Sequence, residues 1–401
     1  MSSPDDVVIT GIGLLTSLGE GADANWEALC AFDAPTIDSE RFAPYAVHPV
    51  PEVDWSRQIA KRGDQRQMEA WQRIGTYTAG LALEDAGIKG NEALCATMDL
   101  VVAAGGGERD VDVDTIILGR IAAGETDTGT IINEVLTSEL RPTLFLAQLS
   151  NLLAGNISIV HKVTGSSRTF MGEEGSGISA IQSAAARIRS GQSTHLLVGG
   201  AYNTEHPDML LSYELGRYLM RDPWRPVWQR ARSEGGGVVT GSGGAFLTLE
   251  SRAHAQARGA RIYAAIGNVA ADLGPTDSAE TRKRLDRLAG EIAIADTDMI
   301  VSAASGSHAR TADEKAFLSE SLPDTPVRGV STATGHLCEA QFPLAVALAA
   351  LSLSKGEAIP VLDDSFEAKT SDAPKSIGVV TVGFDAAEGM AIVTKADGAG
   401  A

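Results

Sequence analysis

Cysteine is scarce in this chain, and the few cysteines form no pattern. Only three occur among 401 residues, namely Cys30, Cys95 and Cys338. They are far apart and odd in number, and they lack the paired spacing of a metal site or a disulfide framework. A reducing, cytoplasmic setting is the simplest interpretation. We expect no metal ion and no cofactor.

Long apolar runs are absent as well. A bilayer span needs about 20 apolar residues, and no run in the sequence approaches that length. The first apolar run, 7–9, follows a short acidic stretch and is too brief for an export signal. We therefore expect neither a membrane span nor a cleavable signal.

Positive charge is in short supply. The chain has 33 lysines and arginines against 52 aspartates and glutamates, which gives a net charge of −19. Such a charge repels nucleic acid and anionic membranes, so both are excluded as general partners. An acidic protein would be repelled too, unless basic side chains gather locally.

The sequence is instead rich in glycine and in alternating strand and helix patterns. Its 43 glycines and 44% hydrophobic residues are typical of a tightly packed α/β protein. The length suggests two packed halves, and the second half repeats the strand and helix order of the first. We predict a layered, pseudo-duplicated α/β fold with halves at 1–250 and 251–395 and a tail at 396–401.

The stretch 165–202 organises the rest of the chain. It reads as a strand, a glycine-rich corner, a helix of small and apolar residues, and a second strand. A strand-to-helix corner at the head of a buried helix suits a nucleophile, because the helix N-terminus stabilises negative charge. This corner holds Glu173 and Glu174, which are neither thiols nor hydroxyls.

Two other glycine patterns could suggest nucleotide binding. Gly11 and Gly13 follow a strand, but no third glycine and no suitably placed acidic residue come after them. The run 241–244 is not followed by the Lys-Ser/Thr pair of a phosphate loop. A structural hairpin within 225–249 is the favoured interpretation of this run.

The stretch 165–202 resembles the active-site elbow of the β-ketoacyl-ACP synthases, the condensing enzymes of fatty-acid and polyketide synthesis. Similar motifs continue along nearly the whole chain, from VVITGIG at 7–13 to Thr-Gly-His at 334–336 and Gly-Phe at 383–384. The resemblance implies the thiolase-like layered αβαβα fold of that family.

Matched residue by residue, the resemblance implies a depleted active site. The family uses a nucleophilic cysteine, a first histidine, a supporting lysine, a second histidine and a Gly-Phe-Gly-Gly loop. The corresponding residues here are Glu174, Ala304, Ser331, His336 and the pair Phe384-Asp385. His336 is retained, and Phe384 keeps the gate of the acyl tunnel. Asp385 adds a carboxylate beside the oxyanion site, where negative charge is unfavourable.

Four neighbouring side chains could replace the missing groups, but each has a simpler role. We expect Ser176 to cap its helix and His161 to be solvated or to cap a helix end. We expect His308 to face solvent from a loop, and Cys338 to be a buried small residue.

The resemblance also implies how the chain meets other proteins. In the family, basic residues near Arg66 contact the acyl carrier protein, and here Gln67 replaces the basic neighbour. Inserts equivalent to 110–139 cap the acyl tunnel and approach the partner subunit.

These features favour a non-catalytic subunit of the chain-length-factor type. It would form a heterodimer with an active β-ketoacyl-ACP synthase and meet acyl carrier protein through that pair, in fatty-acid, very-long-chain fatty-acid or polyketide synthesis. The alternative is an enzyme that decarboxylates malonyl-carrier or condenses with an atypical site. A binding protein unconnected with acyl chemistry is a third hypothesis.

Overall fold

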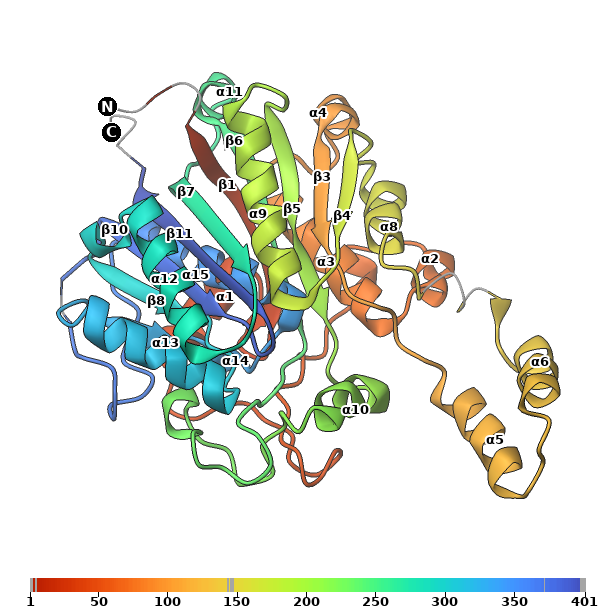
Figure 1. The fold of residues 1–401 in the computed structure, drawn as a ribbon. Coiled ribbons are helices and arrows are strands. Elements are labelled where there is room, and N and C mark those ends of the chain that lie inside the picture. The colour runs from red at the N-terminus through yellow and green to blue at the C-terminus, as the bar shows by residue number, and fades with distance from the viewer. Residues whose placement is uncertain (1–2, 4–5, 143, 145–147, 371, 397–401) are drawn as a thin grey trace.

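The computed structural model describes residues 3, 6–142, 144, 148–370 and 372–396. Ten strands form one continuous sheet path in the order β4-β3-β5-β6-β1-β7-β11-β10-β8-β9, and β2 pairs with β1 (Figure 1). The strands are β1 (Val7–Thr16), β2 (Gly19–Glu20), β3 (Asp99–Ala103), β4 (Ser167–Phe170), β5 (His195–Tyr202), β6 (Gly243–Ser251), β7 (Ala264–Leu273), β8 (Met299–Ser302), β9 (Val327–Gly329), β10 (Ser376–Val382) and β11 (Ala387–Lys395).

Helices connect most of these strands. The α-helices are α1 (Ala22–Cys30), α2 (Arg62–Gln67), α3 (Ala70–Asp85), α4 (Glu92–Thr97), α5 (Val111–Ala122), α6 (Thr128–Ser138), α8 (Leu152–His161), α9 (Glu173–Arg189), α10 (Pro207–Leu215), α11 (Arg252–Ala257), α12 (Ser278–Ile292), α13 (His308–Ser321), α14 (Ser331–Thr334) and α15 (Gln341–Lys355). Short 3-10 turns lie at Trp55–Arg57, Val227–Gln229, Ile294–Asp296 and Cys338–Ala340. None of the described helices is both long enough and apolar enough to cross a membrane.

The sheet path consists of one five-strand arrangement used twice. In the first half β3 pairs in parallel with β4 and β5, and β6 then pairs antiparallel with β5 and β1. In the second half β8 pairs in parallel with β9 and β10, and β11 pairs antiparallel with β10 and β7. The two arrangements meet where β1 pairs with β7. This repeat supports our proposal that the halves are 1–250 and 251–395; of the proposed tail, residues 397–401 lie outside the described residues.

Two equivalent helices, α9 and α15, fill the space between the halves. Each follows the third strand of its own half, and the two helices contact each other as well as strands of both halves. Every residue of α15 from Gln341 to Leu353 is buried, as expected for a helix that is apolar on all sides. Glycine allows α9 to approach closely, because a Cβ at Gly177 would lie 2.5 Å from the carbonyl oxygen of Glu339.

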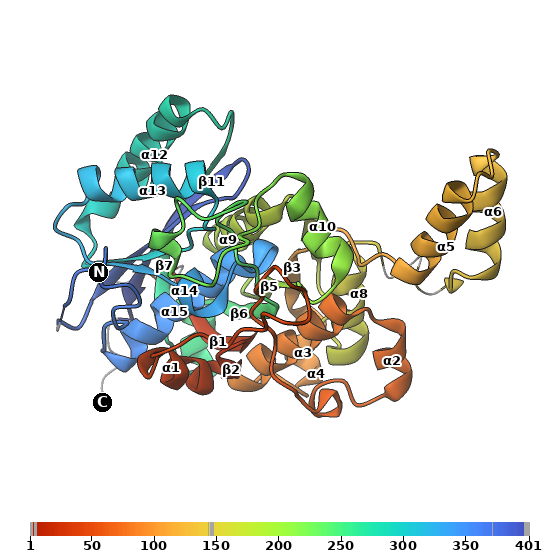
Figure 2. The ribbon, with the colours of Figure 1, turned by 90° about the horizontal axis from the view of Figure 1, so that it is seen from below.

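The outer layers complete the stack. Helices α3 and α8 pack together beside the first half, and α12 and α13 pack together beside the second (Figures 1 and 2). The order is thus helix, sheet, helix, sheet, helix, as predicted. The start of α3 is fixed by a reciprocal pair of hydrogen bonds between Glu69 and Gln72.

Helices α5 and α6 form a hairpin that stands away from this stack (Figures 1 and 2). Val113, Ile131 and Val135 are buried between the two helices. Five other large apolar side chains of the hairpin are exposed: Ile116, Leu118, Ile121, Ile132 and Leu136. The hairpin occupies the acidic insert predicted at 110–139.

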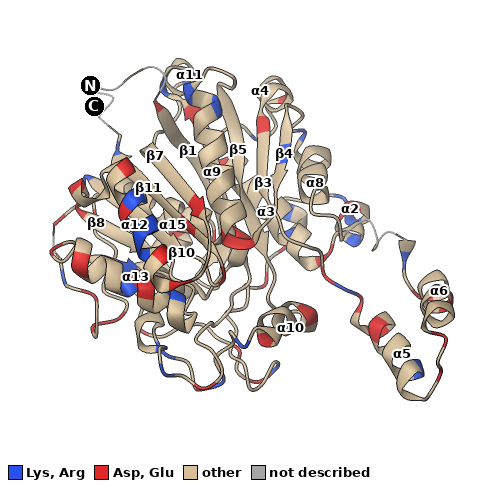
Figure 3. Cartoon of the chain, viewed as in Figure 1, with Lys and Arg blue, Asp and Glu red and all other residues tan. Residues whose placement is uncertain are grey.

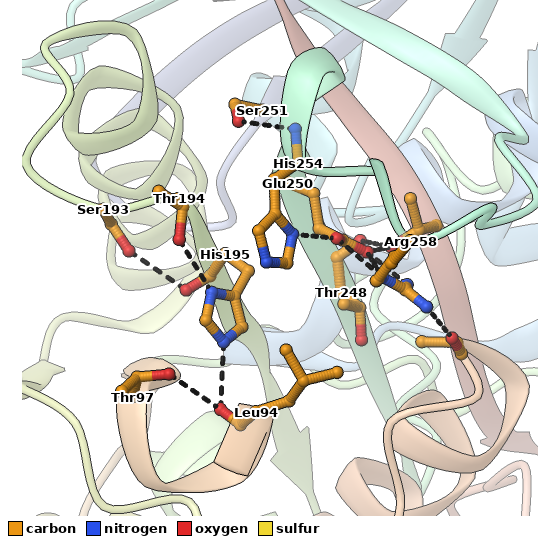
Figure 4. A network of polar contacts seen from close by, with 12 residues as sticks. Leu94, Thr97, Ser193, Thr194, His195, Thr248, Glu250, Ser251, His254 and Arg258 are labelled. Carbon is orange, nitrogen blue, oxygen red and sulfur yellow. Dashed lines mark hydrogen bonds and ion pairs between the residues drawn. The ribbon is translucent and has the colours of Figure 1, made fainter. Parts of the chain in front are cut away.

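The buried carboxylate of Glu250 links β6 to neighbouring segments through hydrogen bonds (Figure 4). Glu250 is 0% exposed and accepts hydrogen bonds from Arg258, His254 and Thr10. The ring of His254 stacks on His195 of β5, with ring centroids 4.6 Å apart. The buried Glu250 carboxylate is thus fully engaged by side chains from neighbouring segments, and we regard this network as structural.

Two local predictions are wrong. The segment 225–249 does not form a hairpin: β6 is its one regular strand, and its pairing partners are β5 and β1. The apolar stretch 141–163 also predicts a single helix, but residues 148, 150 and 151 lie in turns and α8 begins only at Leu152. Residues 143 and 145–147 lie outside the described residues.

Candidate active site

The candidate site begins at the N-terminus of α9, where a sharp turn carries a carboxylate into the protein. Gly172 precedes the helix with φ 122°, and Glu173 begins it with φ 49°. Both values lie in the left-handed region, which glycine adopts freely and glutamate only with strain. Glu173 stays exposed, whereas Glu174 is 1% exposed.

Two groups from the second half hold the Glu174 carboxylate. Its Oε1 atom accepts a 2.7 Å hydrogen bond from the backbone N–H of Phe384 and lies 3.0 Å from Nε2 of His336. Burial by itself raises the pKa of Glu174, but the charge of His336 and the Phe384 N–H outweigh burial, so the pKa is lowered. Glu174 is therefore a buried, ionised carboxylate.

His336 is fully buried beside this carboxylate and is positioned by its backbone. Its N–H donates to the carbonyl of Val239, and its own carbonyl accepts from the N–H of Gly241, both at 2.9 Å. Neither ring nitrogen completes a well-aligned hydrogen bond with any described residue, although Nε2 lies within ion-pair distance of the Glu174 carboxylate. The rings of Phe384 and Tyr213 lie 5.9 and 6.1 Å away, centroid to centroid.

Ala304 and Ser331 are joined to each other rather than to Glu174. Both are 0% exposed, and the Ser331 hydroxyl donates to the carbonyl of Ala304 at 2.6 Å. Gln341 in turn donates to the Ser331 hydroxyl at 2.9 Å. Because alanine and serine bring neither an imidazole nor an ammonium group, these two positions supply no cationic or acid–base side chain.

The loop after β10 presents its backbone to the site and its charge to solvent. Phe384 is 9% exposed, and its ring packs on Tyr213 and Tyr218 with centroids 4.7 and 5.0 Å away. Asp385 is exposed and accepts a 3.3 Å hydrogen bond from the Tyr218 hydroxyl. The backbone donor of Phe384 is thus present although the two glycines that follow the phenylalanine in the family are not, and Glu174 occupies this donor.

A cavity of about 740 Å³ opens beside these residues. Its wall includes Glu173, Phe384 and Asp385, together with residues of β5, α10 and the turn before α15. A smaller cavity of about 320 Å³ lies beside Arg66, an exposed residue of α2, and the basic residues of this helix are coloured blue in Figure 3. Arg73, Arg109 and Arg141 line it as well, alongside several acidic residues, and Arg109 borders both cavities.

Three expectations about neighbouring side chains are wrong. His308 begins α13, is half-buried, and lies 3.1 Å from the Ser233 hydroxyl, so it does not face solvent from a loop. His161 is indeed the last residue of α8, but it is buried and binds the carbonyl of Thr76. Ser176 is not the N-cap, because its hydroxyl donates to the carbonyl of Glu173 and Gly172 takes the cap position.

Two residues at the site went unnoticed in the sequence, Tyr213 and Glu339. Tyr213 comes from α10 and packs against Phe384, and Glu339 lies in the turn at the head of α15. A charged residue directly before a long apolar helix was the available signal for Glu339. Cys338, beside it, is 4% exposed, which confirms that it is buried, and it lines the larger cavity.

A buried glutamate behind β8 predicts a pH effect on stability. Glu314 is 0% exposed and accepts hydrogen bonds from the Ser302 hydroxyl and the N–H of Val382, while burial raises its pKa from 4.5 to about 8. The folded state thus holds a proton that the unfolded state loses above pH 4.5. The stabilisation is complete below that pH and is lost as the pH rises through about 8.

Glu314→Gln should remove this dependence. Relative to the original chain, the variant is expected to gain stability between pH 5 and 8, by up to about 1.4 kcal/mol per pH unit. Urea unfolding of both proteins at pH 5, 6.5 and 8 measures the difference. A difference in free energy of unfolding that stays constant over this range would contradict a raised pKa.

A family model for the β-ketoacyl synthase N-terminal domain matches residues 4–255, more than half of the chain. The chain belongs to the β-ketoacyl synthase family. Position 174, where this ketosynthase-like chain carries its buried carboxylate, lies inside the matched region.

Its relatives include both fatty-acid and polyketide proteins. It is 26% identical over 270 residues to 3-oxoacyl-[acyl-carrier-protein] synthase 2 of Vibrio cholerae, a match covering 65% of this chain and 61% of that protein. This match and that to the Vibrio harveyi protein span about three fifths of the relatives' length. The tetracenomycin polyketide synthase ketoacyl synthase beta subunit of Streptomyces glaucescens is 28% identical, covering 88% and 87%.

Solved structures confirm the thiolase-like fold. The ishigamide ketosynthase/chain length factor superposes with a TM-score of 0.78 and 21% identity over 98% of this chain and 99% of that one. At this identity the likeness concerns the fold alone.

Proposed function

We propose that this chain is a non-catalytic, ketosynthase-like subunit of the chain-length-factor type, which pairs with an active β-ketoacyl-ACP synthase. The observation that carries the proposal is the carboxylate of Glu174, held by His336 and by the backbone N–H of Phe384. A carboxylate cannot form the acyl thioester that condensation requires. It also fills the backbone donor that an acyl oxygen would need.

The remaining positions support the same proposal. Ala304 and Ser331 bring no imidazole or ammonium group. Enolate formation would therefore lack two of the family's stabilising groups even if a nucleophile were supplied. Decarboxylation of malonyl-carrier needs the same groups, and a carboxylate next to His336 opposes the negative charge that this reaction develops. The proposal therefore assigns acyl transfer and condensation to the partner.

The surface offers two features for such a partner. Strand β4 is the end of the sheet path. Ser167 and Arg168 are exposed and Thr169 and Phe170 are partly exposed, so its free edge can accept another strand. The hairpin of α5 and α6 projects exposed apolar side chains that no described residue covers. We propose that both contact the partner, within pathways of fatty-acid, very-long-chain fatty-acid or polyketide synthesis.

Acyl carrier protein would then bind the heterodimer rather than this chain alone. We propose Arg66 as a docking residue, with Arg109 and Arg141 nearby on the rim of the smaller cavity. Acidic side chains share that rim, and Arg109 already pairs with Asp114, so docking here is weak. All three cysteines are free, in keeping with the proposed cytoplasmic setting.

Co-expression with a condensing ketosynthase from the same genome tests the pairing. A one-to-one complex is expected on size-exclusion chromatography. Leu118→Glu on the hairpin, at a side chain 64% exposed, should weaken the complex at least tenfold. Leu215→Glu on α10, 78% exposed, is the matched control and should leave it intact. A stable homodimer that ignores the ketosynthase would contradict the proposal.

A further inference from the structure

The larger cavity is lined by both aromatic rings and carboxylates. Its volume of about 740 Å³ is within the range of small-molecule sites. Four aromatic rings line it, namely Tyr202, Tyr213, Tyr218 and Phe384. They form one cluster, since Tyr213 lies 4.7 Å from Phe384 and 6.4 Å from Tyr202, and Tyr218 lies 5.0 Å from Phe384, between centroids.

Carboxylates stand among these rings. Glu173, Glu339 and Asp385 line the cavity, and none of them forms an ion pair with a basic side chain of the described residues. The basic residue in the wall, Arg109, is paired with Asp114, and the remaining wall carboxylate, Asp208, is paired with His206. The cavity therefore carries negative charge that the protein does not balance.

Glu339 is the most deeply placed of the three. It is 5% exposed, and its carboxylate rests against Gly105, where a Cβ would lie 2.2 Å from Oε1. Burial raises its pKa to about 7, which shows how little its charge is compensated. The chain thus keeps a glycine at position 105 in the wall, where any side chain would collide with this carboxylate.

A second, independent observation concerns Tyr213. Its side chain is buried, with the residue 3% exposed, and it lines the cavity. Its hydroxyl lies beside the thiol of Cys338, which is a weak partner, and it makes no well-aligned hydrogen bond among the described residues. A buried hydroxyl left without a strong partner is unfavourable, and a bound polar group in the cavity would satisfy it.

We propose that this cavity binds an alkylammonium ion. The ammonium group would donate to the carboxylate of Glu339 and to the hydroxyl of Tyr213, and the alkyl part would lie on the aromatic faces, which attract cations. Carboxylates and aromatic faces together select a cation over a neutral or anionic molecule of the same shape. The inference concerns the isolated chain and does not depend on the proposed pairing.

Isothermal titration calorimetry on the purified chain at pH 8 tests this inference, with n-butylammonium chloride as the probe. Saturable binding is expected, with n-butanol and sodium butyrate at least tenfold weaker. Glu339→Gln and Tyr213→Phe should each weaken n-butylammonium at least tenfold. Glu27→Gln, at an exposed glutamate of α1, is the matched control and should bind as the original chain does.

Folding of each variant is checked by circular dichroism. If Glu339→Gln does not fold, Asp385→Asn at the exposed rim replaces it, with at least a threefold loss expected. No saturable n-butylammonium binding, equal binding of butyrate, or binding unchanged in the cavity variants would each overturn the inference. Binding is measured without a ketosynthase, so failure here is separable from failure of pairing.

Discussion

Glu174→Cys is expected to leave the chain unable to form a β-ketoacyl product. The substitution supplies a thiol at a helix N-terminus, which favours the thiolate, and it frees the backbone donor of Phe384. Acylation of residue 174 can then occur. The following step still lacks an imidazole at Ala304, and a positioned acid–base group contributes about 10²–10⁴ in rate. We therefore expect product at least about a hundredfold slower than from a condensing ketosynthase.

The assay supplies acyl-carrier and malonyl-carrier and measures product, while mass spectrometry of peptides follows acylation. Peptide mapping separates residue 174 from the exposed Cys30, and Cys338→Ala in the same background removes the other thiol beside the cavity. Product at the rate of an ordinary ketosynthase would show that Glu174 is the single lesion and that the chain is not catalytically retired.

Glu388→Ala is expected to lower the free energy of unfolding by about 3–5 kcal/mol, because it leaves buried charge unpaired. Glu388 is 0% exposed and binds Arg310, which is 3% exposed, and Arg284. Arg310 also donates to the carbonyl of Gly383, next to the loop that holds Glu174. Removal of the Glu388 carboxylate should therefore disturb the loop that binds Glu174 as well as destabilise the fold.

A matched surface substitution distinguishes the stability contribution of a buried charge from that of an exposed one. Glu320 pairs with Arg282 on the surface, with its side chain 64% exposed, so Glu320→Ala should cost no more than about 1 kcal/mol. Urea unfolding of both variants and of the original chain gives the comparison. Equal losses in the two variants would mean that the Glu388 network is not specially buried.

The elbow was predictable because its determinants are local. The glycine run before a helix of small residues at 172–189 fixes a strand, a turn and a helix, and it places Glu174 at the head of that helix. The alternation of strands and helices likewise predicted a layered fold. The identical pairing of strands in the two halves could not be predicted, because strand register depends on contacts between distant segments.

The partners of the Glu174 carboxylate could not be predicted from the sequence. The residues that hold the carboxylate, His336 and Phe384, lie more than 150 residues away along the chain. The backbone N–H that donates to Oε1 belongs to Phe384 in the second half, so the local pattern of the elbow could not reveal it. His308 was misplaced for a related reason, since its contact with Ser233 depends on tertiary packing.

The most direct test of a non-catalytic subunit is the activity of the purified pair in two single variants. In one, the partner ketosynthase has its nucleophilic cysteine replaced by alanine; in the other, this chain carries Glu174→Gln. The account predicts that the first pair forms no β-ketoacyl product, while the second keeps most of its activity. Product from the first pair, lost on adding Glu174→Gln, would contradict the account.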